Sequence, residues 1–506
     1  MNKKSFSKIW IIVIVIILIV GGVLVWQCLF QTSKTPGLEK LGETSKGIEK
    51  PALNITTGKL TTIPEGYQLT GYPEFSSNGE RIFFRAEKDG KQFIFLDGIK
   101  SNDYYDDINN PVFSADGKRF ACAITKDGKR FMFFDEEPFD GNPDKLEPLI
   151  LLLNQQTSKP GDIIFSPDGN HLVYVKVEGK TFIVILDNKI IGNYELPNFV
   201  SQLTFSLDGN HFAYEASEED KHFVVLDGKK QKEYDEQITW LTFSKDGKHL
   251  AYATVPVSSF GKQKVILDNE EIGSYENVHY LTFSPDSNHL AFISDGVEKD
   301  ILVVDGKEIT THDLIESFIF LGDNQIAYVT KKGSFDRVLV VGNKESKTYP
   351  KITNLTLSLD GKHLAYVAGE IYGEELVVLD DKEGKKYKEI RQNDLVFSPD
   401  SQHLAYRATT KEGEDVVVLD DKEGKNYDFS SSQPIFSPDS QHLACIAYPS
   451  LKSNLLVLDG KEIPFKEMQA EKFLIYTDPI FSTDSAYVSY GAKINNELWW
   501  IVEEVK

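Results

Sequence analysis

A ten-residue phrase that recurs along most of the chain constrains the fold more than any other feature. Its clearest form is FSPDGNHLVY at Phe165–Tyr174, and the copy at Phe243–Tyr252 reads FSKDGKHLAY. Self-similarity with a period of about 40 residues is typical of repeat architectures. Eleven copies begin at Phe75, Phe113, Phe165, Phe205, Phe243, Phe283, Phe320, Leu357, Phe397, Phe436 and Phe481.

The phrase predicts two strands joined by a tight turn. An apolar stretch such as Leu203–Phe205 ends the first strand, and Ser-Pro-Asp-Gly follows. Proline presets φ in such a turn, and glycine accepts positive φ. His-Leu-Ala-Tyr then begins the second strand. We therefore expect Gly169, Gly209, Gly247 and Gly361 to hold positive φ.

Two further strands complete each repeat. An apolar run ending in Asp-Gly or Asp-Asn comes next, as in Phe223–Gly228, and this pattern is a strong hairpin signal. A short fourth segment follows, for example Lys385–Tyr387. Four antiparallel strands in about 40 residues form one blade of a β-propeller. The repeats lack the sustained 3.6-residue periodicity that a stack of helical repeats would require.

The phrase, followed by an apolar strand and an Asp-Gly hairpin, resembles the TolB-like, WD-like propeller repeats of bacterial envelope proteins. The resemblance covers residues 66–506 and implies an all-β fold, a β-propeller of about eleven four-stranded blades. It implies little about activity, because this fold hosts unrelated functions. TolB itself resembles a six-bladed ring joined to a small α/β domain, for which residues 31–64 leave no room.

The number of blades bears on how the ring is built. Eleven blades exceed the usual four to eight of one propeller. We therefore expect two rings, such as five blades plus six or four plus seven. One oversized or open ring is the alternative.

An apolar segment precedes the repeats. Ile9–Phe30 has Gln27 as its only strongly polar residue and, as a helix, can cross a hydrocarbon core about 30 Å thick. Three lysines before it, without acids, place residues 1–8 in the cytoplasm and 31–506 outside. We expect an uncleaved signal anchor that crosses the lipid bilayer of the cytoplasmic membrane once. The alternative is a lipoprotein signal with Cys28 lipidated.

The two ends of the repeat region are expected to meet. Residues 31–64 have the composition of a flexible linker before the repeats at 65–506, but Leu53–Ile63 within it is rich in Thr and Ile. The last repeat supplies only three strands and ends with Glu497–Val505, which would leave an open edge. We expect Leu53–Ile63 to pair with Glu497–Val505 as the missing fourth strand. The alternative is that 53–63 stays part of the linker.

The charge of the chain limits its partners. A net charge of −22 repels phosphate backbones, so no nucleic acid partner is expected. The acidity favours solubility, and Ca²⁺ held by acidic loops is the alternative. Three cysteines cannot build a disulfide framework.

Several repeated side chains resemble sites of chemistry. Seven histidines share one repeat position, where Arg81 and Arg119 also stand. Equivalent positions in different blades lie around a ring, so they cannot converge on one metal ion. We expect structural roles for them, a turn-forming role for the repeated aspartates, and burial of Cys122 and Cys445 in the tyrosine position of their repeats. The histidines are His171, His211, His249, His289, His363, His403 and His442.

The sequence contains no nucleophile elbow, zinc-protease motif or phosphate-binding loop. We expect no catalytic residue, metal or cofactor, and a non-enzymatic scaffold that binds an unidentified protein or glycan. A propeller enzyme acting on glycans or peptides is one alternative, in which Glu215, Glu218 and Glu219 would meet in one pocket. An assembly subunit of an envelope complex is the other.

One irregular spacing supplies the candidate binding loop. Phe113 and Phe165 lie 52 residues apart, about twelve more than the period. Insertions in repeats form loops on one face, which is often a binding face. A neutral loop extension is the alternative. The candidate residues are Asp135, Glu136, Glu137, Phe139, Asp140 and Asp144.

Overall fold

The computed structural model describes residues 56–505 except 135–162, 179, 196–198, 257–260, 297–298, 323, 393, 428, 431, 451–452 and 464–472. All regular secondary structure in these residues is β-strand, and the strands form eleven antiparallel sheets. No helix in this part of the chain is long and apolar enough to cross a membrane. The expected anchor Ile9–Phe30 lies outside the described residues.

Each sheet corresponds to one repeat and is called a blade, numbered along the chain. Blade 1 has β2 (Gln68–Leu69), β3 (Glu74–Phe75), β4 (Ile82–Lys88), β5 (Lys91–Leu96) and β6 (Ile99–Lys100). Blade 2 has β7 (Asp107–Phe113), β8 (Phe120–Lys126) and β9 (Lys129–Phe134), and residues 135–162, which follow β9, lie outside the described residues. Blade 3 has β10 (Ile163–Phe165), β11 (Leu172–Glu178), β12 (Thr181–Leu186) and β13 (Lys189–Glu195). Blade 4 has β14 (Val200–Phe205), β15 (Phe212–Glu218), β16 (Lys221–Leu226) and β17 (Lys229–Tyr234).

The middle blades follow the same plan. Blade 5 has β18 (Gln237–Phe243), β19 (Leu250–Val255), β20 (Gln263–Leu267) and β21 (Glu270–Tyr275). Blade 6 has β22 (Val278–Phe283), β23 (Leu290–Ser294), β24 (Asp300–Val304) and β25 (Lys307–His312). Blade 7 has β26 (Ile315–Phe320), β27 (Ile326–Lys332), β28 (Asp336–Val341) and β29 (Lys344–Glu345). Blade 8 has β30 (Lys351–Leu357), β31 (Leu364–Gly369), β32 (Glu375–Leu379) and β33 (Lys382–Tyr387).

In the last three blades the first strand is split in two. Blade 9 has β34 (Glu389–Ile390), β35 (Val396–Phe397), β36 (Leu404–Thr409), β37 (Asp415–Leu419) and β38 (Lys422–Glu423). Blade 10 has β39 (Phe429–Ser430), β40 (Ile435–Phe436), β41 (Leu443–Ser450), β42 (Ser453–Leu458) and β43 (Lys461–Ile463). Blade 11 has β44 (Phe473–Ile475), β45 (Ile480–Phe481), β46 (Tyr487–Ile494), β47 (Glu497–Glu504) and, from the other end of the described chain, β1 (Gly58–Thr62).

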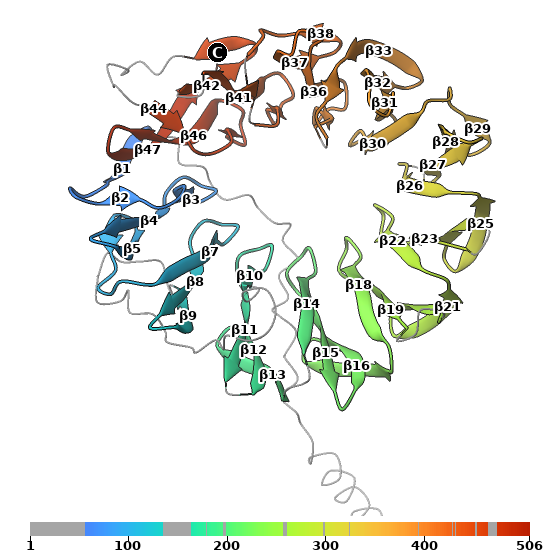
Figure 1. The fold of residues 1–506 in the computed structure, drawn as a ribbon, viewed down its shortest axis with the longest axis horizontal. Coiled ribbons are helices and arrows are strands. Elements are labelled where there is room, and N and C mark those ends of the chain that lie inside the picture. Colours follow the sequence, from blue (N-terminus) through green and yellow to red (C-terminus); the bar gives the residue numbers. More distant parts are fainter. Residues whose placement is uncertain are drawn as a thin grey trace, which may run out of the picture.

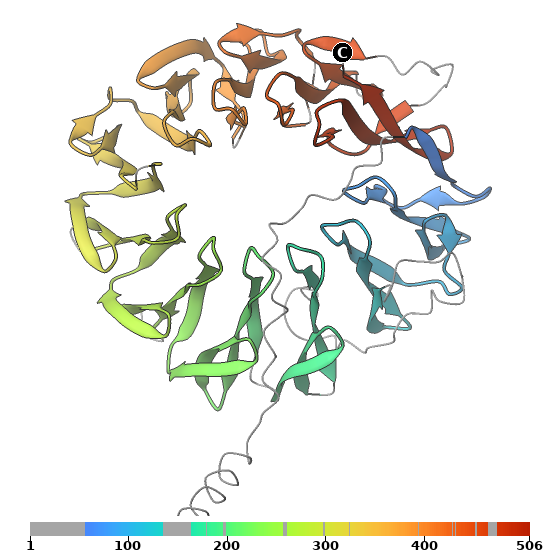
Figure 2. The ribbon, with the colours of Figure 1, turned by 180° about the vertical axis from the view of Figure 1, so that it is seen from behind.

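The blades stand side by side in sequence order around one ring (Figure 1; Figure 2 shows the ring from behind). In blades 3 to 8 the first strand lies nearest the centre (Figure 1). The described hydrophobic clusters each span two neighbouring blades, and one of them joins blade 11 to blade 1. The expectation of two rings is therefore wrong. The repeat specifies the four strands of a blade, but the angle between neighbouring blades depends on side chains from both of them.

The ring closes through both ends of the repeat region. We expected Leu53–Ile63 to pair with Glu497–Val505; the observed ladder joins Gly58–Thr62 to Glu497–Trp500. The backbone N–H of Ile63 donates to the carbonyl oxygen of Asn496 at 2.8 Å. Ile63 is buried with Leu498 and with Phe84 of blade 1, so the closing strand also fills the interface between blades 11 and 1.

The turn after each first strand has the expected backbone. Gly169, Gly209, Gly247 and Gly361 hold φ between 72° and 75°, which confirms that prediction. Serine takes this position in some blades, and Ser287 has a φ of 67°. Its hydroxyl accepts a hydrogen bond at 3.0 Å from the backbone N–H of Asp246 in the preceding blade's turn. Glycine therefore permits close packing of consecutive turns, whereas serine bridges them.

Candidate functional site

The repeated histidines hold neighbouring strands together. Each Nδ1 lies 2.6–2.8 Å from a carboxylate oxygen of the aspartate that directly follows the third strand of the same blade, as His171 does from Asp187. In four blades the imidazole also stacks on the phenylalanine that begins the next blade's phrase, as His211 does on Phe243 with ring centroids 6.4 Å apart. Within the described residues, no three His, Cys, Asp or Glu side chains gather as metal ligands would.

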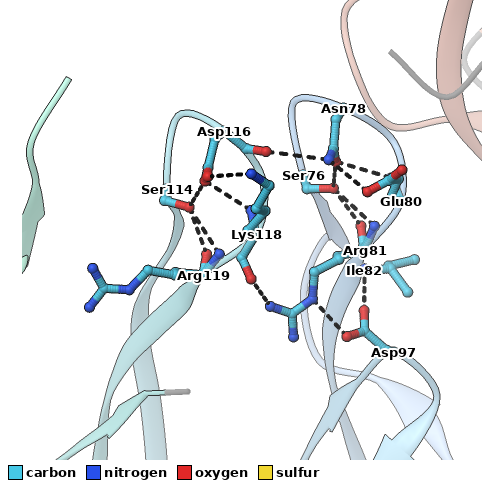
Figure 3. Close-up of polar contacts among 10 residues, drawn as sticks. All are labelled: Ser76, Asn78, Glu80, Arg81, Ile82, Asp97, Ser114, Asp116, Lys118 and Arg119. Atoms are coloured by element: carbon cyan, nitrogen blue, oxygen red, sulfur yellow. Dashed lines mark hydrogen bonds and ion pairs between the residues drawn. The ribbon is translucent and has the colours of Figure 1, made fainter. Parts of the chain in front are cut away.

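Arginine performs the same task in blade 1, as Figure 3 shows. Arg81 Nε lies 2.8 Å from Asp97 Oδ2 in its own blade, and its Nη1 donates to the carbonyl oxygen of Lys118 in blade 2 at 2.6 Å. Asn78 Nδ2 also donates across the gap, to the carbonyl oxygen of Asp116 at 3.3 Å. These side chains join consecutive turns of the ring.

The repeated aspartates organise their own turns. Ser284 Oγ donates to Asp286 Oδ1 at 2.5 Å, and the backbone N–H of Asn288 donates to the same oxygen at 3.1 Å. The hydrogen bond from Ser284 is the largest cause that lowers the pKa of Asp286, so the carboxylate stays ionised as an acceptor. This arrangement recurs around the ring, and it gives the aspartates a local role in the turn.

The acids proposed for an enzyme are engaged separately. Glu215 is buried, and its Oε1 accepts the backbone N–H of Ile238 in blade 5 at 2.9 Å. Glu218 pairs with Lys230 at 2.9 Å on the outer strand of blade 4. Glu215 therefore joins two blades, and Glu218 forms a surface ion pair.

The candidate loop residues Asp135, Glu136, Glu137, Phe139, Asp140 and Asp144 all lie outside the described residues.

A different feature marks the inner strands. In blades 2, 4, 5, 6 and 8 the pairing of first and second strand shifts in the middle, which is a β-bulge. One residue of each bulge holds φ between 50° and 59°. These residues are Asn110, Gln202, Trp240, Tyr280 and Asn354.

Two of these residues are unsuited to the conformation they hold. Asparagine visits left-handed conformations more readily than most residues, whereas a bulky side chain there is an outlier. Trp240 and Tyr280 each carry a conformational cost of about 1–3 kcal/mol. Residues held in such conformations cluster at functional sites. The amides at the same position in the other three blades show that the bulge itself does not need an aromatic residue.

Trp240 and Tyr280 form an exposed aromatic pair. They stand on β18 and β22, neighbouring inner strands of the ring (Figure 1). Trp240 is 39% exposed and Tyr280 is 52% exposed. Their ring centroids lie 6.5 Å apart, and the angle between the ring planes is 39°. We call these two residues the aromatic pair.

A hydrogen bond to the next blade fixes the position of the Trp240 indole. In blade 4 the side chain of Gln202 makes the equivalent bond. Trp240 Nε1 donates to the carbonyl oxygen of Val278 at 3.0 Å, and Gln202 Nε2 donates to that of Ile238 at 2.6 Å in the equivalent place. Tryptophan therefore keeps the bond between blades that glutamine makes. It adds an exposed aromatic surface that the bond does not require.

Polar groups border the aromatic pair. His279 Nε2 lies 2.8 Å from Asp295 Oδ2, and Asn277 Nδ2 donates to the same oxygen at 3.0 Å. The imidazole centroid is 6.3 Å from that of Tyr280. The site thus combines an apolar surface with hydrogen-bonding groups and a carboxylate.

A third aromatic residue occupies the same repeat position in blade 1. Tyr72, three residues before Phe75, is 75% exposed, and its ring lies 5.7 Å from that of Tyr476 in blade 11. Its φ is not in the left-handed region. The strained aromatic positions within the described inner strands are therefore those of blades 5 and 6.

No protein-family model and no curated protein matches the chain. Among solved structures, one described as the Dos1 propeller is 13% identical, covers 60% of this chain and 93% of that one, and has a TM-score of 0.31. Hydrazine synthase from Kuenenia stuttgartiensis is 15% identical, covers 51% of this chain and 94% of that one, and has a TM-score of 0.26. The description of this ring as a propeller rests on its own strand pairings.

Proposed function

We propose that the protein is a non-enzymatic binding module, anchored in the cytoplasmic membrane, that binds a glycan chain at the aromatic pair. The observation that carries this proposal is the exposed Trp240–Tyr280 surface on strained backbone. An aromatic face suits the apolar face of a sugar ring, and Asn277, His279 and Asp295 can exchange hydrogen bonds with its hydroxyls. The likeness of the repeats to TolB-like and WD-like envelope proteins supports an extracytoplasmic role.

The bulges favour a glycan over an extended peptide. Each inner strand is the edge of its sheet, and a peptide could in principle add to such an edge as a further strand. A bulge with positive φ interrupts the row of backbone groups that strand addition needs. A ligand held by side chains fits this surface better. A proline-rich peptide, which docks on aromatic side chains, is the competing outcome of the test.

The test separates binding from folding by using residues that other blades already carry. Trp240→Gln copies Gln202 and keeps a donor for the carbonyl oxygen of Val278, and Tyr280→Asn copies Asn354. Asparagine tolerates this conformation better than tyrosine, and glutamine already holds it in blade 4, so we expect an unchanged or raised melting temperature. We expect each to weaken glycan binding by about fivefold to 150-fold, because about 1–3 kcal/mol of stacking is lost.

Glycan arrays followed by titration with the best oligosaccharide provide the measurement, with the full-length protein in detergent. Phe335→Ala is the matched control, since Phe335 is an exposed aromatic residue on a hairpin of blade 7 and its loss should leave binding unchanged. The proposal is wrong if no glycan binds, if proline-rich peptides bind the aromatic pair instead, or if both variants bind as well as the wild-type protein.

The membrane part of the proposal has its own test. The apolar Ile9–Phe30 and the lysines before it support a cytoplasmic N-terminus with the ring outside. Protease added to intact spheroplasts should therefore degrade the ring. Protection that lasts until the membrane is lysed would refute this topology and leave the glycan proposal standing.

A further inference from the structure

Neighbouring blades repeatedly share a pair of tyrosines. A tyrosine in the second strand of one blade meets, edge to face, a tyrosine that ends the outer strand of the blade before it. Tyr387 and Tyr406 are one such pair, with ring centroids 6.2 Å apart and planes at 81°. Three other interfaces have the same geometry: Tyr194 with Tyr214, Tyr234 with Tyr252, and Tyr349 with Tyr366.

The interface between blades 9 and 10 lacks one ring of the pair. Tyr427 keeps its place after the outer strand of blade 9, but Cys445 stands where the second tyrosine would be. A cavity of about 240 Å³ lies beside them. The equivalent place between blades 8 and 9, where Tyr406 is present, has a cavity of about 120 Å³.

In blade 2 a cysteine in this position has larger neighbours. Cys122 takes the tyrosine position there, and Phe120 and Phe133 fill the space beside it, with ring centroids 6.2 Å apart. The corresponding residues of blade 10 are Leu443 and Val457, paired in the same registers. These smaller side chains do not replace the missing ring.

A larger hollow of about 340 Å³ lies between blades 7 and 8, beside Tyr366. It has a different origin, because the phrase of blade 7 is one residue shorter and Tyr366 still fills its position. Polar atoms make up a larger share of its surface than of the surface of the cavity beside Cys445.

The walls of the cavity between blades 9 and 10 indicate what it can hold. Val417, Leu419, Leu443 and Val457 are apolar. Burial raises the pKa of the Cys445 thiol to about 12, so the thiol is neutral and packs as a small apolar group. The charged residues of the lining belong to β38, to the chain on either side of it and to the turn after β42. They are Asp420, Lys422, Glu423, Lys425 and Asp459. An engineered apolar cavity of about 150 Å³ in another protein binds benzene.

We propose that this cavity is a binding site for a small neutral aromatic compound, a phenol or a molecule with a phenol-sized end. The ring takes the place that tyrosine occupies in the other blades and meets the Tyr427 ring edge to face. Its polar substituent faces the charged loops. This inference does not depend on the glycan site, which lies on the inner strands of blades 5 and 6.

The probe is 4-fluorophenol, observed by ¹⁹F NMR with the full-length protein in detergent. We expect saturable binding to one site, and loss of binding by at least tenfold in Cys445→Tyr, which supplies the missing ring covalently. That variant should melt at an equal or higher temperature, because it restores an arrangement found in four other interfaces. Cyclohexanol, which has similar size but no aromatic ring, should bind more weakly.

Tyr406→Cys is the matched variant. It removes the ring from the interface between blades 8 and 9 and should create a second site for 4-fluorophenol. A loss of binding in Cys445→Tyr together with a gain in Tyr406→Cys would establish that the missing ring makes the site. The proposal is overturned if 4-fluorophenol shows no saturable binding, or if Cys445→Tyr folds and binds it as well as the wild-type protein.

Discussion

Gly361→Ala is expected to lower the free energy of unfolding by about 2–5 kcal/mol, the sum of about 1–2 kcal/mol of left-handed strain and about 1–3 kcal/mol of overpacking. Gly361 has a φ of 72°, and a Cβ there would lie 2.4 Å from the Cα of Gly322 and 2.9 Å from its nitrogen. Gly322 belongs to the shortened phrase of blade 7. Because the obstacle is backbone, no rotamer change can relieve it, and blades 7 and 8 would have to move apart.

Substitutions at two other glycines distinguish the cost of left-handed backbone strain from the cost of a steric clash. Gly333 has a φ of 70° and no atom within 4 Å of a built Cβ, so Gly333→Ala should cost only the strain, about 1–2 kcal/mol. At Gly247 the nearest atom, Asp208 Oδ1 at 2.9 Å, belongs to a side chain that can move, so its cost should be intermediate. Denaturant unfolding of the three variants measures this order. Equal losses for Gly361→Ala and Gly333→Ala would show that the close approach of the two blades is not required.

The blade could be predicted from the sequence because its signals are local. Gly209 follows Asp208 in a turn whose geometry is set by four adjacent residues, and the hairpin after Leu226 is encoded in the same way. The number of blades in a ring is not local. It depends on the angle between neighbouring blades, which is set by packing between side chains such as Val184 of blade 3 and Phe212 of blade 4. The repeat phrase does not determine that angle.

The aromatic pair can be recognised in the sequence by its place in the repeat, although it belongs to no catalytic motif. Trp240 and Tyr280 each stand three residues before the phenylalanine that begins a phrase, where most copies have a polar residue such as Asn110, Gln202 or Asn354. Comparing the repeats position by position would have identified them. What the sequence could not supply is the left-handed backbone, because a β-bulge depends on the register between two strands.

The largest remaining effect is expected at the closure of the ring. Deleting residues 56–63 removes β1 and leaves β47 as an unpaired edge. The deletion also takes away the buried Ile63 and uncovers Leu498, which is fully buried in the interface of blades 11 and 1. Loss of one such aliphatic side chain typically costs about 2–5 kcal/mol, and the lost ladder adds to it. We expect this deletion to lower the melting temperature more than any single substitution in the outer strands.

A cross-link tests the same closure without removing any residue. Thr62 and Glu497 face each other in the antiparallel ladder, and opposed residues of such a ladder have Cα atoms about 4.5–5.5 Å apart, which a disulfide can span. Thr62→Cys with Glu497→Cys should therefore oxidise readily and raise the melting temperature, because the bond ties together the two ends of the ring. Thr62→Cys with Glu503→Cys is the matched control, since Glu503 lies near the far end of β47 and pairs with Val488 instead. The native Cys122 and Cys445 are buried and should not compete. If Thr62→Cys with Glu497→Cys stays reduced and the deletion of 56–63 melts like the wild-type protein, the ring is not closed by β1.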